Sequence, residues 1–225
     1  MQWTIISLGG AIIVPDDIDV VFLKRFRRLL MGRRSHRFVI VCGGGGTNRH
    51  YNAAANALTR PSADDLDWLG IRALTLNAEL VRVMFGRLAY GQVVLNPAGL
   101  KRVPSQRIII GAAFRPGSSS DLDAVLWAEK FKARRVINLS NISHVYSADP
   151  RSKASARPLN DLTWADYRRL IGRRWSPRLS TPFDPVASAR AVRLGLTVAV
   201  LNGRNIANVQ RAIDGKLFVG TVLHP

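Results

Sequence analysis

The sequence has 225 residues, with 33 Lys and Arg against 15 Asp and Glu, a formal net charge of +18 and 47% hydrophobic residues. That apolar content is enough for a buried core and excludes a wholly disordered chain. The single cysteine, Cys42, excludes an intrachain disulfide, and no apolar run reaches the roughly 18 residues of a membrane span. The first residues lack the pattern of a secretory signal, so we expect a cytoplasmic protein.

The high positive charge has two interpretations. The basic residues are mostly Arg, spread along the whole chain and often paired, as in Arg27-Arg28. Such a charge favours anionic partners, among them nucleotides and RNA. Arg residues on solvated helix faces would give the same composition without any binding role. Composition therefore leaves an RNA partner open.

The N-terminal part predicts strands that end in glycine. The apolar residues Trp3 to Leu8 predict a buried strand that ends at Gly9-Gly10. Pro15-Asp16-Asp17 signals the start of a helix, whose apolar residues recur at helical spacing as far as Leu29. A second strand over Phe38 to Cys42 leads directly into Gly43 to Gly46.

The middle of the chain continues the alternation. An Ala-rich helix is expected from about Thr47 to Leu58, and an amphipathic helix is marked by Leu69 to Val83. Short strands are expected over Gln92 to Leu95 and over Arg107 to Ile110. The second of these strands ends at the polar loop from Gly111 to Ser120.

The C-terminal part repeats the same order. A helix from about Asp121 to Phe131 is followed by a strand, Val136 to Leu139, which ends at Ser140-Asn141. Residues 147 to 182 are the most irregular and are expected to be the most mobile. The last expected elements are the helices Leu162 to Ile171, Pro185 to Leu194 and Asn205 to Ile213, and the strands Leu196 to Leu201 and Leu217 to Val222.

The alternation of strands and helices predicts the fold class. Strands separated by helices of this length form a mostly parallel sheet that is covered on both faces. The sequence shows no repeat, low-complexity tract or linker, so we expect a single α/β domain over residues 1 to 225.

Four strands end in small or glycine-rich polar segments, at Gly9-Gly10, Gly43 to Gly46, Gly111 to Ser120 and Ser140-Asn141. Ligands bind beyond the carboxyl ends of the strands in open α/β sheets. Glycine lets backbone N–H groups approach an anion, and a following helix adds its positive N-terminus. One such segment is often only a tight turn, but four favour a phosphate-rich ligand.

Several familiar sites are absent from the sequence. It contains no G-x-x-x-x-G-K-[ST] segment, no G-x-G-x-x-G after the first strand and no G-x-S-x-G. These absences argue against a P-loop protein, a dinucleotide-binding Rossmann site and an α/β-hydrolase. The four histidines lack metal-ligand spacing, which argues against a zinc site.

The ordered set of segments resembles the amino acid kinase superfamily, and within it the archaeal type of the uridylate (UMP) kinases. The resemblance covers nearly the whole chain. It is carried by Gly9-Gly10, Gly43-Gly44-Gly45 with Arg49, Asp67-Trp68-Leu69-Gly70-Ile71, the segment from Phe114 to Asp121, Ser140-Asn141-Ile142 with Val145-Tyr146, Asp149-Pro150, Asp184-Pro185 and Gly220-Thr221.

This resemblance implies a three-layer α/β/α sandwich and the transfer of the ATP γ-phosphoryl group to UMP, with Mg²⁺, in pyrimidine nucleotide biosynthesis. It also implies a homohexamer. In the catalytic centre it places Gly9, Gly10 and Arg49. For ATP it implies Gly45, Ser140, Asn141, Tyr146 and Asp149. For UMP it implies Gly44, Asp67, Phe114, Arg115, Pro116, Gly117, Ser118, Ser119 and Ser120, while the metal ligands stay unassigned.

Some positions depart from the family pattern. Ser7 stands where many members carry Lys, and Ala11 stands where Ser is usual. Ser143 and His144 replace the Asp-Gly of the family's Asn-x-Asp-Gly-Val-Tyr segment. If the glycine of the family's turn has a positive φ, His144 needs a different backbone conformation at that position.

Two alternatives follow from these departures. The chain could be a degenerate member that binds nucleotide or RNA without efficient transfer, or a kinase of the same fold with another acceptor, such as carbamate, glutamate or isopentenyl phosphate. Asp121 or Asp123 could supply the missing carboxylate, although Asp121 could equally cap a helix. Without the family context, Asp67 would be a first-turn partner of a helix dipole and Asp184 a helix start.

Overall fold

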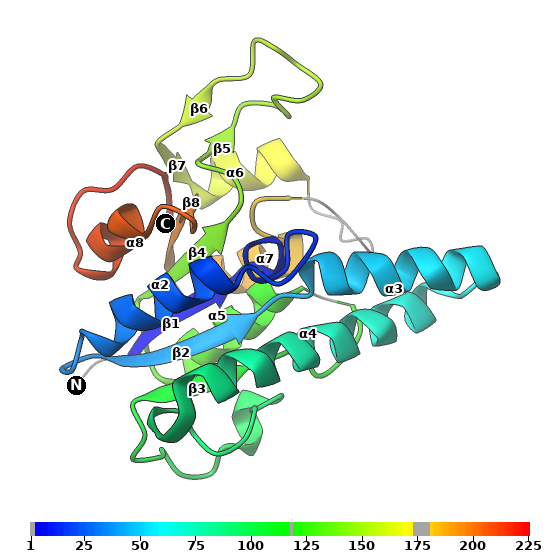
Figure 1. Ribbon diagram of the computed structural model, residues 1–225. Coiled ribbons are helices and arrows are strands. Elements are labelled where there is room, and N and C mark those ends of the chain that lie inside the picture. The colour runs from blue at the N-terminus through cyan, green and yellow to red at the C-terminus, as the bar shows by residue number, and fades with distance from the viewer. Residues whose placement is uncertain (1–2, 118, 173–180) are drawn as a thin grey trace.

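The computed structural model describes residues 3–117, 119–172 and 181–225, and in these ranges a seven-stranded sheet forms the centre of the molecule (Figure 1). The strand order is β3-β2-β1-β4-β8-β9-β7. All neighbours pair in parallel except β8 and β9. The bounds are β1 Trp3–Leu8, β2 Arg37–Cys42, β3 Ile108–Gly111, β4 Arg135–Ser140, β7 Asp161–Thr163, β8 Thr197–Asn202 and β9 Thr221–His224.

Helices cover both faces of this sheet, which confirms the predicted three-layer α/β/α sandwich. The bounds are α1 Gly10–Ile13, α2 Val20–Met31, α3 Gly45–Leu58, α4 Ala63–Phe85, α5 Ser120–Lys130, α6 Trp164–Ile171, α7 Pro185–Arg193 and α8 Ile206–Ile213, with 3-10 turns at Gly86–Leu88 and Pro97–Gly99. Side chains alternate along β1, so Ile6 packs with α2, α4 and α8 while Ile5 packs with α5, α6 and α7. None of the described helices has the length and apolarity to span a membrane.

The register of the central strands brings the strand ends to one edge. Leu8 of β1 lies opposite both Cys42 of β2 and Leu139 of β4. The Gly9 N–H donates to the Leu139 carbonyl at 2.8 Å, and the Gly43 N–H donates to the Leu8 carbonyl at 3.0 Å. Three of the four predicted segments, far apart in sequence, therefore meet at the carboxyl edge of the sheet. From this edge α3 and the N-terminal half of α4 extend outward as a helical pair (Figure 1).

Helix α4 is longer than its apolar periodicity predicted. It begins at Ala63, where Ser62 and Asp65 form a reciprocal capping box. Asp64 and Asp65 occupy the first turn. Asp67 lies in the second turn, so its interpretation as a first-turn dipole partner is wrong.

Two predicted strands differ from the structure. Of Gln92 to Leu95, only Val94 pairs, as an isolated bridge to Gly111. The last strand begins at Thr221 rather than Leu217, because the side chain of Asn208 in α8 holds both the N–H and the carbonyl of Val219. Backbone groups that are already bonded to a side chain are not available for a sheet ladder.

The irregular stretch from 147 to 182 contains more structure than the sequence indicated. A small antiparallel pair joins β5 (Val145–Tyr146) to β6 (Pro158–Leu159), and β7 precedes α6. Residues 173–180 of this stretch lie outside the described residues. The short strands and the single turn α1 escaped prediction because two to four residues show no readable periodicity.

Candidate active site

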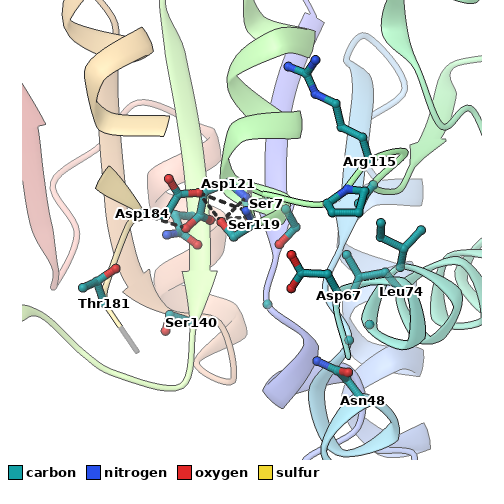
Figure 2. A pocket seen from close by; sticks show the side chains of 18 of the residues that line it. Ser7, Asn48, Asp67, Leu74, Arg115, Ser119, Asp121, Ser140, Thr181 and Asp184 are labelled. Carbon is teal, nitrogen blue, oxygen red and sulfur yellow. Dashed lines mark hydrogen bonds between the residues drawn. The ribbon is translucent and has the colours of Figure 1, made fainter. Parts of the chain in front are cut away.

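A cavity of about 310 Å³ opens at the carboxyl ends of β1 and β4, between the α3–α4 pair on one side and the start of α7 on the other (Figure 2). A volume of this size suits a small-molecule ligand. The lining residues are Ser7, Gly9, Gly44, Asn48, Asn52, Leu66, Asp67, Gly70, Ile71, Leu74, Ala113, Arg115, Pro116, Ser119, Ser120, Asp121, Asn138, Leu139, Ser140, Thr181, Pro182 and Asp184.

The first two glycine segments pack directly against each other beside this cavity. A Cβ atom on Gly10 would lie 2.1 Å from the Gly45 nitrogen, and one on Gly45 would lie 2.1 Å from the Gly10 carbonyl oxygen. Gly45 also has a φ of +56°. Only glycine fits this close approach and this backbone conformation. The two loops therefore form one backbone surface, as expected for a phosphate cradle.

Gly44 places the N-terminus of α3 in the cavity. It is the N-cap residue of α3, and no side chain caps the helix there. The loop is held from behind by Asn77 of α4, whose Nδ2 donates to the carbonyls of Gly43 and Gly44 at 2.9 Å each. The positive end of a helix of 14 residues is thus fixed at the cavity wall.

Asp67 projects from α4 into the cavity and anchors the opposite loop. Its Oδ2 accepts a hydrogen bond from the Gly117 N–H at 3.1 Å. This contact joins α4 to the loop between β3 and α5. The carboxylate is half-buried and faces the space between the two elements (Figure 2). An ionised carboxylate accepts several hydrogen bonds, so Asp67 can bind a ligand hydroxyl as well.

A network of carboxylates and hydroxyls lies on the other side of the cavity. The Ser7 hydroxyl donates to Asp121 Oδ1 at 3.1 Å, and the Asp184 N–H donates to Asp121 Oδ2 at 3.2 Å. The Ser119 hydroxyl donates to Asp184 Oδ2. Ser119, not Asp121, is the N-cap of α5, so Asp121 is free to face the cavity. Asp184 is the N-cap of α7, as predicted, and it also lines the cavity, which the sequence did not indicate.

Burial and the neighbouring Asp184 charge raise the pKa of Asp121 to about 7. Burial is also the main reason that the pKa of Asp123 rises to about 8, with a further contribution from Asp184 and an opposing one from the Arg115 cation. Asp123 is 2% exposed and lies outside the cavity lining. Asp121 is therefore the one of the two candidate carboxylates that faces the cavity.

Most of the residues assigned to UMP lie together. Gly44, Asp67, Arg115, Pro116, Ser119 and Ser120 all line the cavity. Phe114 and Gly117 belong to the same loop without lining it, and the Arg115 guanidinium lies 5.3 Å from the Phe114 ring centre. Ser118 lies outside the described residues.

The residues assigned to ATP and to catalysis are more dispersed. Gly9 and Ser140 line the cavity, whereas Gly10 and Gly45 lie just behind it in the packed loops. Asn141, Tyr146 and Asp149 stand outside the lining. Tyr146 shares a hydrogen bond with Ser143 at 2.9 Å, and Asp149 pairs with Arg151 at 2.9 Å.

Arg49 points away from the cavity. Its guanidinium donates to the Pro15 carbonyl and lies 3.9 Å from Asp16. His144, which replaces the family's turn glycine, has an ordinary backbone, since Lys132 is the only residue other than glycine with a positive φ in the described ranges. The chain accommodates this departure without strain.

Several lining residues were absent from the sequence assignment, in particular Asn48, Asn52 and Thr181. Asn48 and Asn52 are four residues apart on a helix that starts at a glycine loop, so helical spacing places them on one face below that loop. That spacing was a readable signal. Thr181 carried no local signal, because its place in the cavity depends on a connection between distant elements.

Parallel strands ending in glycine loops, with an uncapped helix N-terminus directed into a cavity, define an α/β protein built to bind phosphate groups. Comparison with known proteins specifies the family. The amino acid kinase family matches residues 2–202, and the chain belongs to this family.

The chain is similar to uridylate kinases of archaea. The uridylate kinase of Methanospirillum hungatei is 32% identical over 226 residues, which cover 99% of this chain and 95% of that protein. That of Pyrococcus abyssi is 28% identical, covering 98% and 99%. The crystal structure of uridylate kinase from Archaeoglobus fulgidus superposes with a TM-score of 0.83 at 27% identity, covering 99% of this chain and all of that one. These findings confirm the resemblance inferred from the sequence.

Proposed function

We propose that this chain is a UMP kinase, which transfers the γ-phosphoryl group of ATP to UMP and produces UDP and ADP. The observation that carries this proposal is the meeting of the two glycine loops with the N-terminus of α3 in a cavity that also contains Asp67. Full-length similarity to archaeal uridylate kinases supports the choice of substrate. It does not favour the degenerate, nucleotide-binding alternative.

Phosphoryl transfer depends on positioning and on charge stabilisation more than on covalent help. The α3 N-terminus at Gly44 offers N–H groups and a positive dipole to the phosphates. We assign the phosphoryl centre to Gly9 and Gly10 with Gly44 and Gly45 beside them. UMP would occupy the side of Asp67 and Arg115, and ATP the side of Ser140. Asn141, Tyr146 and Asp149 would contact ATP only beyond the cavity, and Arg49 would have to turn away from Pro15 to take part.

The charge of the lining indicates how a metal ion would enter. Among the residues that the structure describes, the lining includes Asp67, Asp121 and Asp184 and one cation, Arg115. Two nucleotides would add further negative charge. No group of three His, Cys, Asp or Glu side chains that could hold a metal occurs in the described residues. We propose that Mg²⁺ arrives bound to the phosphates of ATP, where it supplies positive charge against the transferring group.

We also propose a homohexamer and a cytoplasmic location. Exposed apolar side chains on the α3–α4 pair support assembly, because Tyr51, Leu58, Leu76 and Val83 face solvent in the isolated chain. The use of ATP as donor supports the cytoplasm. Light scattering of the purified protein would measure the assembly.

The test is an ADP-release assay with ATP, Mg²⁺ and each of UMP, CMP, glutamate and isopentenyl phosphate. We expect turnover with UMP that exceeds turnover with the other acceptors. An Asp67→Asn variant should raise the KM for UMP about tenfold or more, since a hydrogen bond to a charged group contributes about 1.5–3 kcal/mol. No ADP release with UMP at high enzyme concentration would refute the proposal, and ATP binding without transfer would restore the degenerate alternative.

A further inference from the structure

Two asparagines in the wall of the cavity carry amide oxygens that accept no hydrogen bond from any residue that the structure describes. Asn48 and Asn52 lie one helical turn apart on α3, and both line the cavity. The Oδ1 atoms of both are fully buried, and neither has a hydrogen-bond partner among the described residues. Asn52 as a whole is 6% exposed. Figure 2 shows Asn48 at the edge of the cavity, below Asp67.

Leaving a buried polar atom without a partner costs stability, and an apolar side chain would avoid this cost. The surroundings are nevertheless shaped to hold the amide of Asn48. Cβ atoms added at Gly44 and at Gly70 would lie 2.7 Å from the Asn48 Cβ and 3.3 Å from its Oδ1, respectively. The small residues on both sides thus make room for this side chain. A ligand that supplies hydrogen-bond donors would relieve the cost.

The chemistry of UMP indicates which group supplies these donors. Its phosphate offers almost only acceptors near neutral pH. The edge of uracil offers a single N–H donor, which can satisfy only one of the two amide oxygens. The ribose offers two adjacent hydroxyls, each of which can donate. The two amide oxygens and the Asp67 carboxylate place three hydrogen-bond acceptors in one wall of the cavity, and the donating hydroxyls of the ribose are complementary to them.

The order of residues along α3 agrees with this choice. Gly44, Asn48 and Asn52 lie on successive turns that lead outward from the phosphate cradle. Gly44 packs against Leu74 and Asn48 lies beside Gly70, so α3 and α4 run antiparallel and Asn52 lies near the level of Asp67. In a nucleoside monophosphate the sugar follows the phosphate directly. A phosphate bound at Gly44 therefore brings the ribose to the two amides.

We propose that Asn48 and Asn52, together with Asp67, bind the ribose hydroxyls of the acceptor nucleotide and make the enzyme select ribonucleotides over deoxyribonucleotides. The inference rests on the proposed UMP kinase function and deepens it. The amides are specificity-determining residues, since they touch the sugar and not the phosphoryl group that is transferred.

The experiment compares kcat/KM for UMP, dUMP and CMP in the wild type and in the variants Asn48→Leu, Asn52→Leu and Asn56→Ala. Asn56 is an exposed amide one turn beyond Asn52 and does not line the cavity; its Nδ2 donates to the Asn52 carbonyl, so its variant controls for a change in the α3 backbone that leaves both cavity amides in place. For each Leu variant we expect kcat/KM for UMP to fall roughly 3- to 10-fold, as for the loss of one neutral hydrogen bond. Since dUMP lacks only the 2′-hydroxyl, its kcat/KM should change much less in the variant whose amide accepts from that hydroxyl. The UMP/dUMP ratio should therefore fall in at least one Leu variant, while the UMP/CMP ratio stays constant in both.

Thermal unfolding distinguishes this role from a structural one. Replacing an unpartnered buried amide with Leu should raise the unfolding temperature of Asn52→Leu, although the variant is the poorer UMP kinase. A structural amide would instead lower that temperature and leave the ratio unchanged. If the Leu variants do not fold, Asn48→Ala and Asn52→Ala allow the same comparison with a smaller side chain, and the UMP/dUMP ratio should again fall in at least one of them.

Three results would overturn the inference: equal losses for UMP and dUMP in both Leu variants, a change confined to the UMP/CMP ratio, or a wild type that phosphorylates UMP and dUMP equally. Each of these differs from a failure of the proposed function, in which the wild type would not phosphorylate UMP at all.

Discussion

Replacing Asp121 with Asn should remove a pH dependence from the stability of the protein. In the folded state burial and the Asp184 charge raise the pKa of Asp121 to about 7, from an ordinary 3.8. Between these pH values the folded state holds a proton that the unfolded state has lost. The stability that this proton confers is complete below about pH 4 and is lost as the pH rises toward 7.

The size of the effect follows from the shift in pKa. One unit corresponds to about 1.4 kcal/mol, so a shift of about three units corresponds to about 4 kcal/mol. Asp121 keeps part of its surface in contact with the cavity, and water there weakens the effect. We therefore expect the wild type to lose about 2–4 kcal/mol more than Asp121→Asn between pH 4 and pH 7.

The assay is urea unfolding of both proteins at pH 4.5, 5.5, 6.5 and 7.5, with Asp17→Asn as a control, because Asp17 is exposed. Any constant cost of the substitution cancels when only the dependence on pH is compared. Asp123, which also has a raised pKa, is present in all three proteins; only the small part of its shift that the Asp121 charge causes is lost in Asp121→Asn, in the same direction as the main effect. Parallel curves for the wild type and Asp121→Asn would refute the raised pKa and with it the burial of this carboxyl group.

Three further predictions follow from the same structure. Gly45→Ala should destabilise the fold by more than about 3 kcal/mol, because its Cβ would lie 2.1 Å from the Gly10 oxygen. Gly215 also has a positive φ, but no described heavy atom lies within 4 Å of a Cβ added there, so Gly215→Ala should destabilise the fold by only about 1 kcal/mol. Equal losses of stability for the two variants in urea unfolding would contradict the close packing of the loops. Cys42 is fully buried, and burial raises the pKa of its thiol, so a thiol reagent should label it only after the protein unfolds. Rapid labelling in native buffer would contradict this prediction and show that β2 is accessible to the reagent. The hydrogen bond between His224 and Asp161 raises the pKa of His224 above 6.5, and Asp161→Asn should lower it in an NMR titration; an unchanged value would mean that the contact does not form in solution.

Much of the candidate site could be predicted from short stretches of neighbouring residues. Gly9-Gly10 and Gly43 to Gly46 were readable because glycine directly after an apolar strand indicates a tight turn or a close approach of the backbone to a neighbour. The loop from Gly111 to Ser120 was readable in the same way, as a polar segment at the end of a strand. Asp67 was found only through family resemblance, since nothing local separates a binding carboxylate from a helix-stabilising one. The assignment of Asn141, Tyr146 and Asp149 to ATP stays a prediction.

The sequence by itself determined the alternation of strands and helices, the parallel sheet and the glycine loops at its carboxyl edge. These features depend on periodicity and on backbone freedom, which are properties of neighbouring residues. Only the tertiary structure decided that Asp184 bonds to Asp121, 63 residues earlier, and that the buried amides of α3 face the same cavity. Such contacts depend on how distant elements pack, so their chemistry could not be read from any one segment.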